Sequence, residues 1–252
     1  MQETTEHVNH NGRSPLILVR GLEKTYYSEG VPTPVLHGLT FSVESGEFVA
    51  IMGPSGSGKS TLLHILGFLD EPTGGQYLFE SKTVEEYSPT ELAHVRNERM
   101  GFIFQAFNLL PRMAILENVR LPLLYSNISP REWDERAQKA LEAVGLSHRL
   151  SFEPSQLSGG EKQRVAIARS LVTNPSVIFA DEPTGNLDSR SGQAVMEILE
   201  KLNTEDKHTI ILITHETYTA EHAARVINIK DGLIESDRRV DHRLNAHENF
   251  IK

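Results

Sequence analysis

One stretch of eight residues restricts the fold more than any other part of the chain. Residues 53–60 read Gly-Pro-Ser-Gly-Ser-Gly-Lys-Ser and match the pattern G-x-x-x-x-G-K-[ST]. An apolar run at residues 48–52 precedes this stretch, and leucines and an isoleucine at helical spacing follow it at residues 62–66. This order predicts a buried strand, a glycine-rich loop that binds phosphate, and a helix.

The residue types of this loop suit the binding of a phosphate chain. Gly53, Gly56 and Gly58 allow backbone conformations that turn successive N–H groups toward phosphate oxygens. The positive end of the following helix faces the same anion. Lys59 supplies a mobile charge for the β- and γ-phosphates, and the Ser60 hydroxyl can bind Mg²⁺. The candidate nucleotide-binding residues here are Gly53, Pro54, Ser55, Gly56, Ser57, Gly58, Lys59, Ser60 and Thr61.

Composition excludes several kinds of site. The length of 252 residues suits one large domain, or one domain with an inserted lobe. The absence of cysteine excludes disulfides and thiolate metal sites, and the net charge of −9 argues against a general nucleic-acid binder. No run approaches the ~18 apolar residues that span a membrane. We therefore expect a soluble, cytoplasmic protein that works at a membrane only through a partner.

Short apolar runs separated by turn residues predict the strands of an α/β fold. The loop between the first two strands contains Gly30, Pro32 and Pro34, and Asp231 with Gly232 marks a late hairpin. We expect strands at residues 16–19, 39–43, 76–79, 100–104, 177–180 and 209–214.

A composition shift toward helix-forming sequence divides the chain. Ser129 with Glu132 predicts a capping box, and Gly145 is expected to end the helix that follows. We expect a disordered tail over 1–14, a main domain over 15–235 with a helical lobe at about 106–172, and a charged tail over 236–252.

Polar side chains follow three of the expected strands. Asp181 and Glu182 come directly after residues 177–180, at the strand end where open α/β sheets bind ligands. Asp181 suits a Mg²⁺ site, and Glu182 suits a base or a residue that positions water. Gln105 and His215 end two other strands, although a loop opening and a structural histidine explain them equally well.

Two further stretches have open interpretations. Ser158 precedes two glycines at the start of a predicted helix, where it could favour an anion or act as an ordinary N-cap. Tyr26 and Tyr27 adjoin each other on an expected strand, so their side chains point to opposite faces. Only one of them can stack on a purine, and we expect the other to pack, although plain core aromatics explain the pair equally well.

Several motifs occur in a fixed order over residues of about 16–235: the phosphate loop, Gln105, the LSGGE stretch ending at Glu161, Asp181-Glu182, Asp188 and His215. This order resembles the ATP-binding subunits of ABC transporters. The resemblance implies a P-loop NTPase with a RecA-like α/β core, an antiparallel β lobe and an inserted helical lobe. It also implies an ATPase that hydrolyses ATP with Mg²⁺ and is coupled to transport.

This resemblance assigns expected roles to single residues. Tyr26 would stack on adenine, while Lys59 and the loop amides would hold the phosphates. Ser60 and Gln105 would bind Mg²⁺, with Asp181 in its outer shell. Glu182 would polarise the attacking water, and His215 would contact the γ-phosphate. The expected catalytic residues are Glu182, His215, Lys59 and Gln105.

The same family implies a head-to-tail homodimer around two ATP molecules. Ser158, Gly159 and Gly160 of one chain would contact the nucleotide held by the other chain. Asp188 would lie near the seam between the two chains. ATP binding would close this dimer, and loss of the γ-phosphate contacts would reopen it.

Longer stretches at 104–111, 117–123 and 181–188 look most like the branch for macrolide export, lipoprotein release and antimicrobial peptides, which includes a cell-division ATPase. Its permeases typically have four spans and a large extracytoplasmic domain. An amino-acid importer ATPase, which usually has Ser-Ala-Leu-Asp at 185–188, and a non-transport ABC ATPase are the alternatives. A permease helix is expected to contact Phe107, Leu109, Leu110 and Pro111, unless these residues pack the helical lobe.

Overall fold

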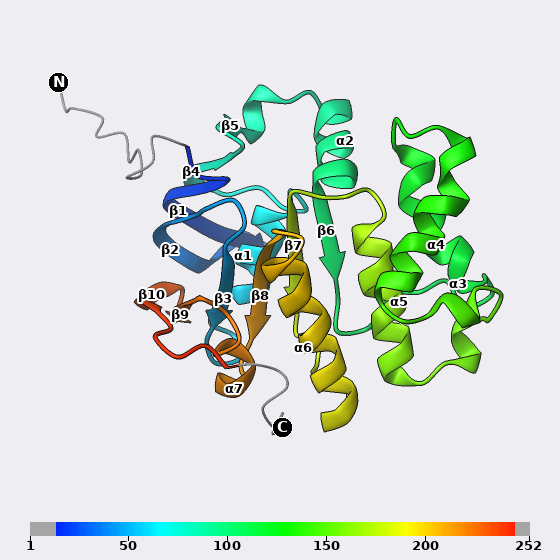
Figure 1. Cartoon of the computed structure of the whole chain (residues 1–252). Coiled ribbons are helices and arrows are strands. Elements are labelled where there is room, and N and C mark those ends of the chain that lie inside the picture. Colours follow the sequence, from blue (N-terminus) through cyan, green and yellow to red (C-terminus); the bar gives the residue numbers. More distant parts are fainter. Residues whose placement is uncertain (1–13, 245–252) are drawn as a thin grey trace.

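A computed structural model describes residues 14–244 and shows two sheets beside a group of helices (Figure 1). The larger sheet has the strand order β10-β9-β3-β8-β7-β6, and the smaller sheet has the order β2-β1-β4-β5. All but one residue of the expected N-terminal tail lie outside the described residues, as do residues 245–252 of the expected C-terminal tail.

The larger sheet forms the centre of the molecule. It consists of β3 (Phe48–Met52), β6 (Met100–Ile103), β7 (Val177–Asp181), β8 (Thr209–Thr214), β9 (Arg225–Lys230) and β10 (Leu233–Arg239). Every pairing in it is parallel except that of β9 with β10. The central strands are almost continuously apolar because helices or the smaller sheet cover both faces.

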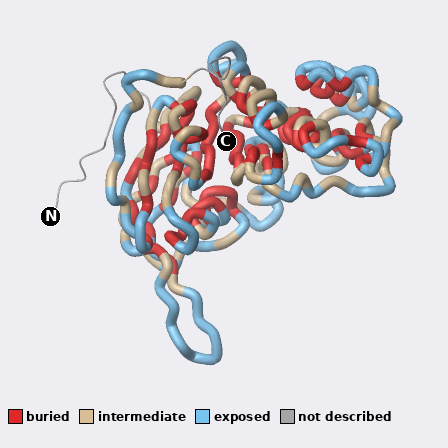
Figure 2. Tube along the Cα trace, turned by 90° about the horizontal axis from the view of Figure 1, so that it is seen from below, coloured by how far each residue is buried: buried red, intermediate tan, exposed pale blue. Residues whose placement is uncertain are grey.

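Alternate residues of these strands form two hydrophobic cores. Phe48 and Ala50 of β3 face the core that also contains residues of α5 (Gly159–Leu171) and α6 (Ser189–Thr204). Val49 and Ile51 face the other core, with α1 (Lys59–Leu66) and the smaller sheet. In Figure 2 the buried segments run through the interior of the molecule, with exposed segments around them.

The smaller sheet is antiparallel and differs from the prediction at its first hairpin. Its strands are β1 (Ile17–Ser28), β2 (Val31–Val43), β4 (Gly74–Phe79) and β5 (Lys82–Thr83). The predicted loop containing Pro32 and Pro34 is wrong, because both residues belong to β2, which pairs with β1. An edge strand tolerates proline, since one side of it needs no N–H donors. Glu29 and Gly30, with φ of 50° and 82°, make the tight turn.

The helices between β6 and β7 lie side by side at one end of the large sheet (Figure 1). Between β5 and β6 come η1 (Val84–Glu86) and α2 (Pro89–Arg99). The group itself comprises α3 (Ile115–Arg120), η2 (Leu121–Tyr125), η3 (Pro130–Glu132), α4 (Trp133–Ala143), η4 (Ser147–Arg149), η5 (Pro154–Gln156) and α5. Asn118 is fully buried there and bonds the backbone of Leu110, Met113 and Ala114.

The predicted capping box at Ser129 is wrong, although the helix end at Gly145 is confirmed. Ser129 starts a 3₁₀ turn in which the Glu132 N–H donates to the Ser129 carbonyl oxygen at 2.9 Å rather than to its hydroxyl. The Glu132 carboxylate accepts from Arg136 instead of reaching back. Gly145 has a φ of 73° and follows the last turn of α4. Carbonyl oxygens of that turn accept hydrogen bonds from the N–H groups of Gly145 and of the residue after it.

The C-terminal hairpin is confirmed and extends further than the sequence indicated. α7 (Thr217–Ala220) precedes it, and Asp231 and Gly232, with φ of 48° and 73°, connect β9 to β10. The C-terminal tail was expected to begin at 236, whereas β10 continues to Arg239 because it pairs with β9 over residues 236–239. Asp237 there accepts two 2.6 Å bonds from Arg225. Among residues 14–244, no helix combines the length and apolar composition that crossing a bilayer requires.

Candidate nucleotide-binding site

A cavity of about 930 Å³ lies at the carboxyl ends of β3, β7 and β8. The predicted site residues that it brings together are up to 162 positions apart in the sequence, from Gly53 to His215. The expected site residues that line this cavity are Gly53, Pro54, Ser55, Gly56, Gly58, Lys59, Ser60, Thr61, Gln105, Asp181, Glu182 and His215. The cavity therefore brings together most of the predicted site residues.

The phosphate loop is pressed closely against two neighbouring strands. A Cβ at Gly53 would lie 2.1 Å from the Ile229 carbonyl oxygen, and a Cβ at Gly58 would lie 2.7 Å from Leu36. Gly58 also has a φ of 98°, which favours glycine. Ser57 is buried beneath the loop and does not line the cavity, and its hydroxyl has no hydrogen-bond partner within residues 14–244.

Lys59 is held inside the loop by the loop's own backbone. Its ammonium group donates to the carbonyl oxygens of Gly53 and Pro54 at 2.8 Å each, and the residue is only 7% exposed. Burial lowers the pKa of Lys59, and the negative charges of Glu182 and Asp181 partly oppose that change. The carboxylates therefore help to keep this buried lysine charged and ready for an anion.

Glu182 and His215 form a pair on the wall of the cavity. The Nδ1 atom of His215 lies 2.7 Å from a carboxylate oxygen of Glu182. Glu182 has a φ of 43°, and its N–H donates to the Ile213 carbonyl oxygen at 2.9 Å, which fixes this unfavourable backbone conformation. Because an ionised carboxylate only accepts, the hydrogen bond requires a proton on Nδ1.

Asp181 and Gln105 offer oxygen atoms in the cavity that Ser60 also lines. Burial and the neighbouring Glu182 charge raise the pKa of Asp181, while His64 and Lys59 act in the opposite direction. Gln105 donates from its amide nitrogen to Asn186 at 3.4 Å, so its amide oxygen is the atom left for a cation. Hydroxyl, amide and carboxylate oxygens are the donors that Mg²⁺ prefers, so these residues fit the expected ion.

That fit depends on oxygens from a nucleotide. Within residues 14–244, no group of three or more His, Asp and Glu side chains could hold a metal ion. Mg²⁺ in phosphoryl-transfer sites commonly uses one or two protein oxygens together with phosphate oxygens and water.

Tyr26 and Tyr27 differ sharply in their surroundings. The Tyr26 hydroxyl donates to Asp70 at 2.7 Å and lies near Thr61, a residue that lines the cavity. Tyr26 is therefore at the edge of the cavity without lining it. The expectation that the other tyrosine packs is wrong, because Tyr27 is 73% exposed on the far face of the strand.

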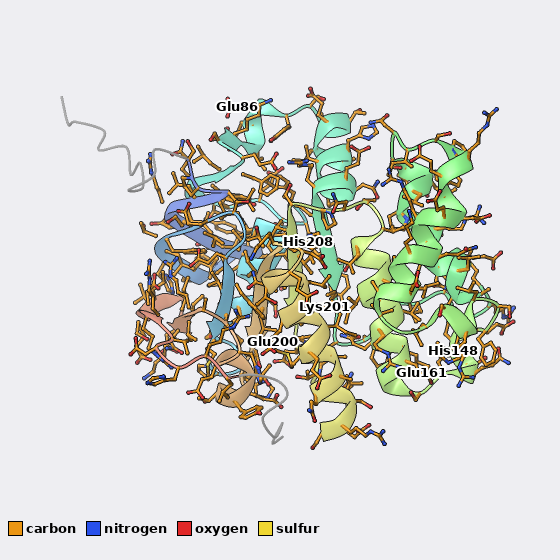
Figure 3. All side chains as sticks on the ribbon, in the orientation of Figure 1. Glu86, His148, Glu161, Glu200, Lys201 and His208 are labelled. Atoms are coloured by element: carbon orange, nitrogen blue, oxygen red, sulfur yellow. The ribbon has the colours of Figure 1, made fainter. Side chains whose placement is uncertain are left out.

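The glycine pair after Ser158 lies outside this cavity, on the helical side of the molecule. The Ser158 hydroxyl accepts from the Glu161 N–H at 3.2 Å, and the Glu161 carboxylate accepts from the Ser158 N–H at 2.9 Å. Figure 3 labels Glu161 at the start of α5. The N-cap interpretation is therefore confirmed for this chain by itself, and Gly159 follows Ser158 as the first helical residue.

Asp188 lies close to the same glycine pair. It caps α6, accepting from the N–H and the hydroxyl of Ser191 at 2.9 and 2.8 Å. A Cβ at Gly160 would lie 2.7 Å from the Ser191 hydroxyl. The starts of α5 and α6 thus form one surface, which is separate from the cavity.

Six residues that line the cavity were not predicted as site residues: Val35, Met52, Ile213, Asn228, Ile229 and Glu235. Val35 comes from β2, and Asn228 and Glu235 come from the β9–β10 hairpin. No motif marks them, because their position follows from strand pairing: β9 pairs with β3, and its end thereby lies beside the phosphate loop.

Comparisons with known proteins agree with this geometry. Residues 36–185 match the family described as ABC transporter. The macrolide export ATP-binding/permease protein MacB of Bdellovibrio bacteriovorus is 51% identical over 225 residues, or 89% of this chain and 34% of that protein. The uncharacterized ABC transporter ATP-binding protein YvrO of Bacillus subtilis is 46% identical over 226 residues, or 90% of this chain and 98% of that protein.

The chain spans about a third of the length of the MacB relatives that it matches. Among solved structures, the dimeric bacterial ABC transporter cassette MJ0796 has a TM-score of 0.81 and 41% sequence identity. That match covers 90% of this chain and 99% of the cassette. The resemblance and the fold class that the sequence indicated are confirmed, and this chain belongs to the ABC transporter family as one of its ATP-hydrolysing cassettes.

Proposed function

We propose that this cassette binds ATP with Mg²⁺ in the 930 Å³ cavity and uses hydrolysis to power a membrane permease for export or for mechanical work beyond the membrane. The main support for the proposal is the Glu182–His215 pair, which lies on the wall of the cavity that the phosphate loop lines. The similarity to macrolide export proteins supports the direction of transport.

The binding step uses atoms that already face the cavity. Lys59 would exchange its two carbonyl partners for phosphate oxygens, since a charged acceptor bonds an ammonium more strongly than a carbonyl does. The Ser60 hydroxyl and the Gln105 amide oxygen would hold Mg²⁺, with Asp181 acting through water. When bound, that ion supplies positive charge at the β- and γ-phosphate oxygens.

The chemical step depends on Glu182. Its carboxylate would orient a water molecule toward the γ-phosphate and accept the proton, with His215 keeping the carboxylate oriented through its Nδ1–H group. The strained backbone at Glu182 supports this assignment, because such strain is common where a side chain must take a fixed position. The remainder of the catalysis is electrostatic, from Lys59, the loop amides and the ion.

A second copy of the chain would complete each site. Ser158, Gly159 and Gly160 lie outside their own cavity, beside Asp188. A two-fold arrangement would place these residues against the nucleotide of the partner and Asp188 at the seam. The dimeric form of the similar MJ0796 cassette, including a post-hydrolysis state bound to ADP and Pi, supports this arrangement.

The permease would bind a groove of about 480 Å³ between α2, β6 and the helical group. Leu69, Phe102, Phe104 and Tyr125 line it, and Tyr125 is 71% exposed. The sequence placed this contact at residues 107–111. Phe107 and Leu109 instead pack against the core that contains the helical group. Leu110 is 45% exposed and Pro111 is also exposed, but neither lines the groove. We therefore move the proposed contact with a cytoplasmic permease helix from residues 107–111 to this groove.

The Glu182→Gln variant tests the catalytic and dimeric parts together. We expect it to bind ATP but to hydrolyse it at least ~10²-fold more slowly, because the amide cannot accept the proton. The trapped ATP state should appear as a dimer by light scattering. Glu235→Gln makes the same change elsewhere on the cavity wall and should behave like the wild type.

Each part of that experiment can fail separately. Normal hydrolysis by Glu182→Gln would remove this residue from the chemistry. A variant that binds ATP but stays monomeric would contradict the dimer for the isolated chain.

Purification from native membranes tests the partner. A tag on this chain should recover an integral membrane protein with four spans and a large extracytoplasmic domain. A partner with more spans and no such domain would favour an amino-acid-type importer. Recovery of no membrane protein would favour a non-transport ABC ATPase, and recovery of a cell-division partner would favour signalling.

A further inference from the structure

The turn that follows α1 contacts the edge of the nucleotide cavity through one carboxylate. Asp70 accepts the Tyr26 hydroxyl on one oxygen at 2.7 Å and the Lys24 ammonium on the other at 2.6 Å. Lys24 is 7% exposed, also donates to the Glu71 carbonyl oxygen at 2.6 Å, and lies 4.8 Å from the centre of the Tyr26 ring. The tyrosine is thus held at its hydroxyl and covered by a cation.

We propose that Asp70 is a positioning residue for the nucleotide base: by holding Tyr26 and Lys24 it presents one face of the tyrosine ring to adenine and sets the contribution of the base to affinity. The inference rests on the proposed function, in which Tyr26 stacks on adenine. Asp70 itself would touch no part of the nucleotide. Its effect would pass entirely through the orientation of the ring.

The contacts of Tyr26 explain why the ring needs such a holder. The residue is 39% exposed near the end of β1, and the neighbouring Tyr27 is 73% exposed, so hydrophobic packing restrains this part of the strand weakly. Thr61, in the helix that begins at the phosphate loop, lies near the Tyr26 hydroxyl. The bond to Asp70 therefore fixes the ring beside the phosphate site.

Lys24 leaves a single face of the ring for a base. Because its ammonium covers one face, a planar ligand can stack only on the other face. Burial alone would raise the pKa of the Asp70 carboxyl, but the hydrogen bonds from Lys24 and Tyr26 outweigh it and lower that pKa. The carboxylate thus stays charged, and the three side chains form a stable unit at neutral pH.

The Asp70 carboxylate accepts one hydrogen bond within the turn, from the Glu71 N–H at 2.8 Å, but other bonds also hold the turn in place. The Thr73 N–H donates to the Glu23 carbonyl oxygen at 2.8 Å, and the Thr25 N–H donates to the Thr73 hydroxyl at 3.0 Å. The Leu69 N–H donates to the His64 carbonyl oxygen at 2.7 Å. Removing the carboxylate should therefore leave the turn and α1 in place while releasing Tyr26.

Two ligands separate base recognition from phosphate binding. Mg²⁺-ADP contains the adenosine, Mg²⁺-pyrophosphate lacks it, and neither is hydrolysed as ATP is. We expect Asp70→Ala to weaken ADP binding by about tenfold, within the range for stacking one base on an aromatic ring, and to change pyrophosphate binding by less than about twofold. In steady-state ATPase assays the variant should raise KM and leave kcat nearly unchanged.

Three further variants control the experiment. Glu71→Ala removes the same charge one residue later, keeps the carbonyl oxygen that accepts Lys24, and should bind both ligands like the wild type. Asp70→Asn keeps an oxygen acceptor and should restore part of the ADP affinity. Tyr26→Phe keeps the ring without its hydroxyl, and we expect it to add little to Asp70→Ala, because both break the same contact.

The outcomes distinguish this inference from the proposed function. Wild-type protein that binds neither ligand would contradict the proposed function and, with it, the role of Asp70. Tight ADP binding by Asp70→Ala would overturn only the role of Asp70. An equal loss for both ligands, or an equal loss in Glu71→Ala, would show a general structural effect and also overturn it.

Discussion

Two glycine-rich helix starts in this molecule look alike in sequence and differ in structure. α1 follows Gly58 and has no side-chain cap and no acidic residue in its first turn. α5 follows Ser158, which caps it, and Glu161 in its first turn completes a capping box. The first start leaves N–H donors and a positive dipole for a ligand, whereas the second satisfies its own donors and adds a negative charge.

This difference shows which half of a nucleotide site each region can supply. The region around α1 can bind an anion by itself, because its loop, Lys59 and the strand-end carboxylates share one cavity. The start of α5 does not line such a cavity and is already capped, so by itself it offers no comparable anion site. The contrast supports an assignment in which one chain binds ATP and a second chain completes the site.

The largest expected effect contrasts the lysines of the two regions. Lys59→Ala should lower ATP turnover by roughly 10²-fold or more, because it removes a charge that stabilises the transferred phosphoryl group. Lys162→Ala removes the lysine in the first turn of α5 and should change turnover by less than about threefold. Phosphate release measures both, and equal losses would mean that the α1 region has no special place in the chemistry.

A smaller effect separates the cap at Ser158 from its proposed role in a dimer. Ser158→Ala should lower the free energy of unfolding by about 1 kcal/mol, while Ser158→Asn keeps a side-chain acceptor and should cost little. In the Glu182→Gln background, both variants should reduce the ATP-dependent dimer in light scattering. If Ser158→Asn dimerises like its parent, Ser158 contributes only its cap.

The smallest effect concerns the stability of the cavity itself. Because folding raises the pKa of Asp181, the folded state binds its proton more tightly, and stability falls as pH rises through the interval from the unfolded to the folded pKa. Without ligand, Asp181→Asn should therefore be more stable than the wild type at pH 7, by at most about 1 kcal/mol after solvent screening. The advantage should shrink toward pH 4.

Urea unfolding of both proteins between pH 4 and 7.5 measures this difference. A less stable Asp181→Asn at pH 7 would contradict the burial penalty. Phe179→Ala, in the buried strand before Asp181, should instead cost about 3–5 kcal/mol at every pH, which gives the scale for a core position.

Local sequence patterns predicted the elements whose formation depends mainly on nearby residues. The apolar runs at β3, β7 and β8 and the Asp231-Gly232 turn were predictable, since burial and tight-turn geometry leave few alternatives. The Ser129 capping box failed because a competing partner, Arg136, took the glutamate. The first hairpin was missed because prolines in β2 are acceptable only on an edge strand, and edges are known only once strands pair.

The sequence by itself determined the phosphate loop, the acids and histidine at the strand ends, and the family resemblance, because these depend on residue types at short spacing. Tertiary structure alone decided that β9 and β10 bring Asn228 and Glu235 to the cavity, that Ser158 lies outside it, and that Asp70 holds Tyr26. Those contacts join residues that are distant in the sequence, and only the pairing of strands and the packing of the turn after α1 brings them within bonding distance.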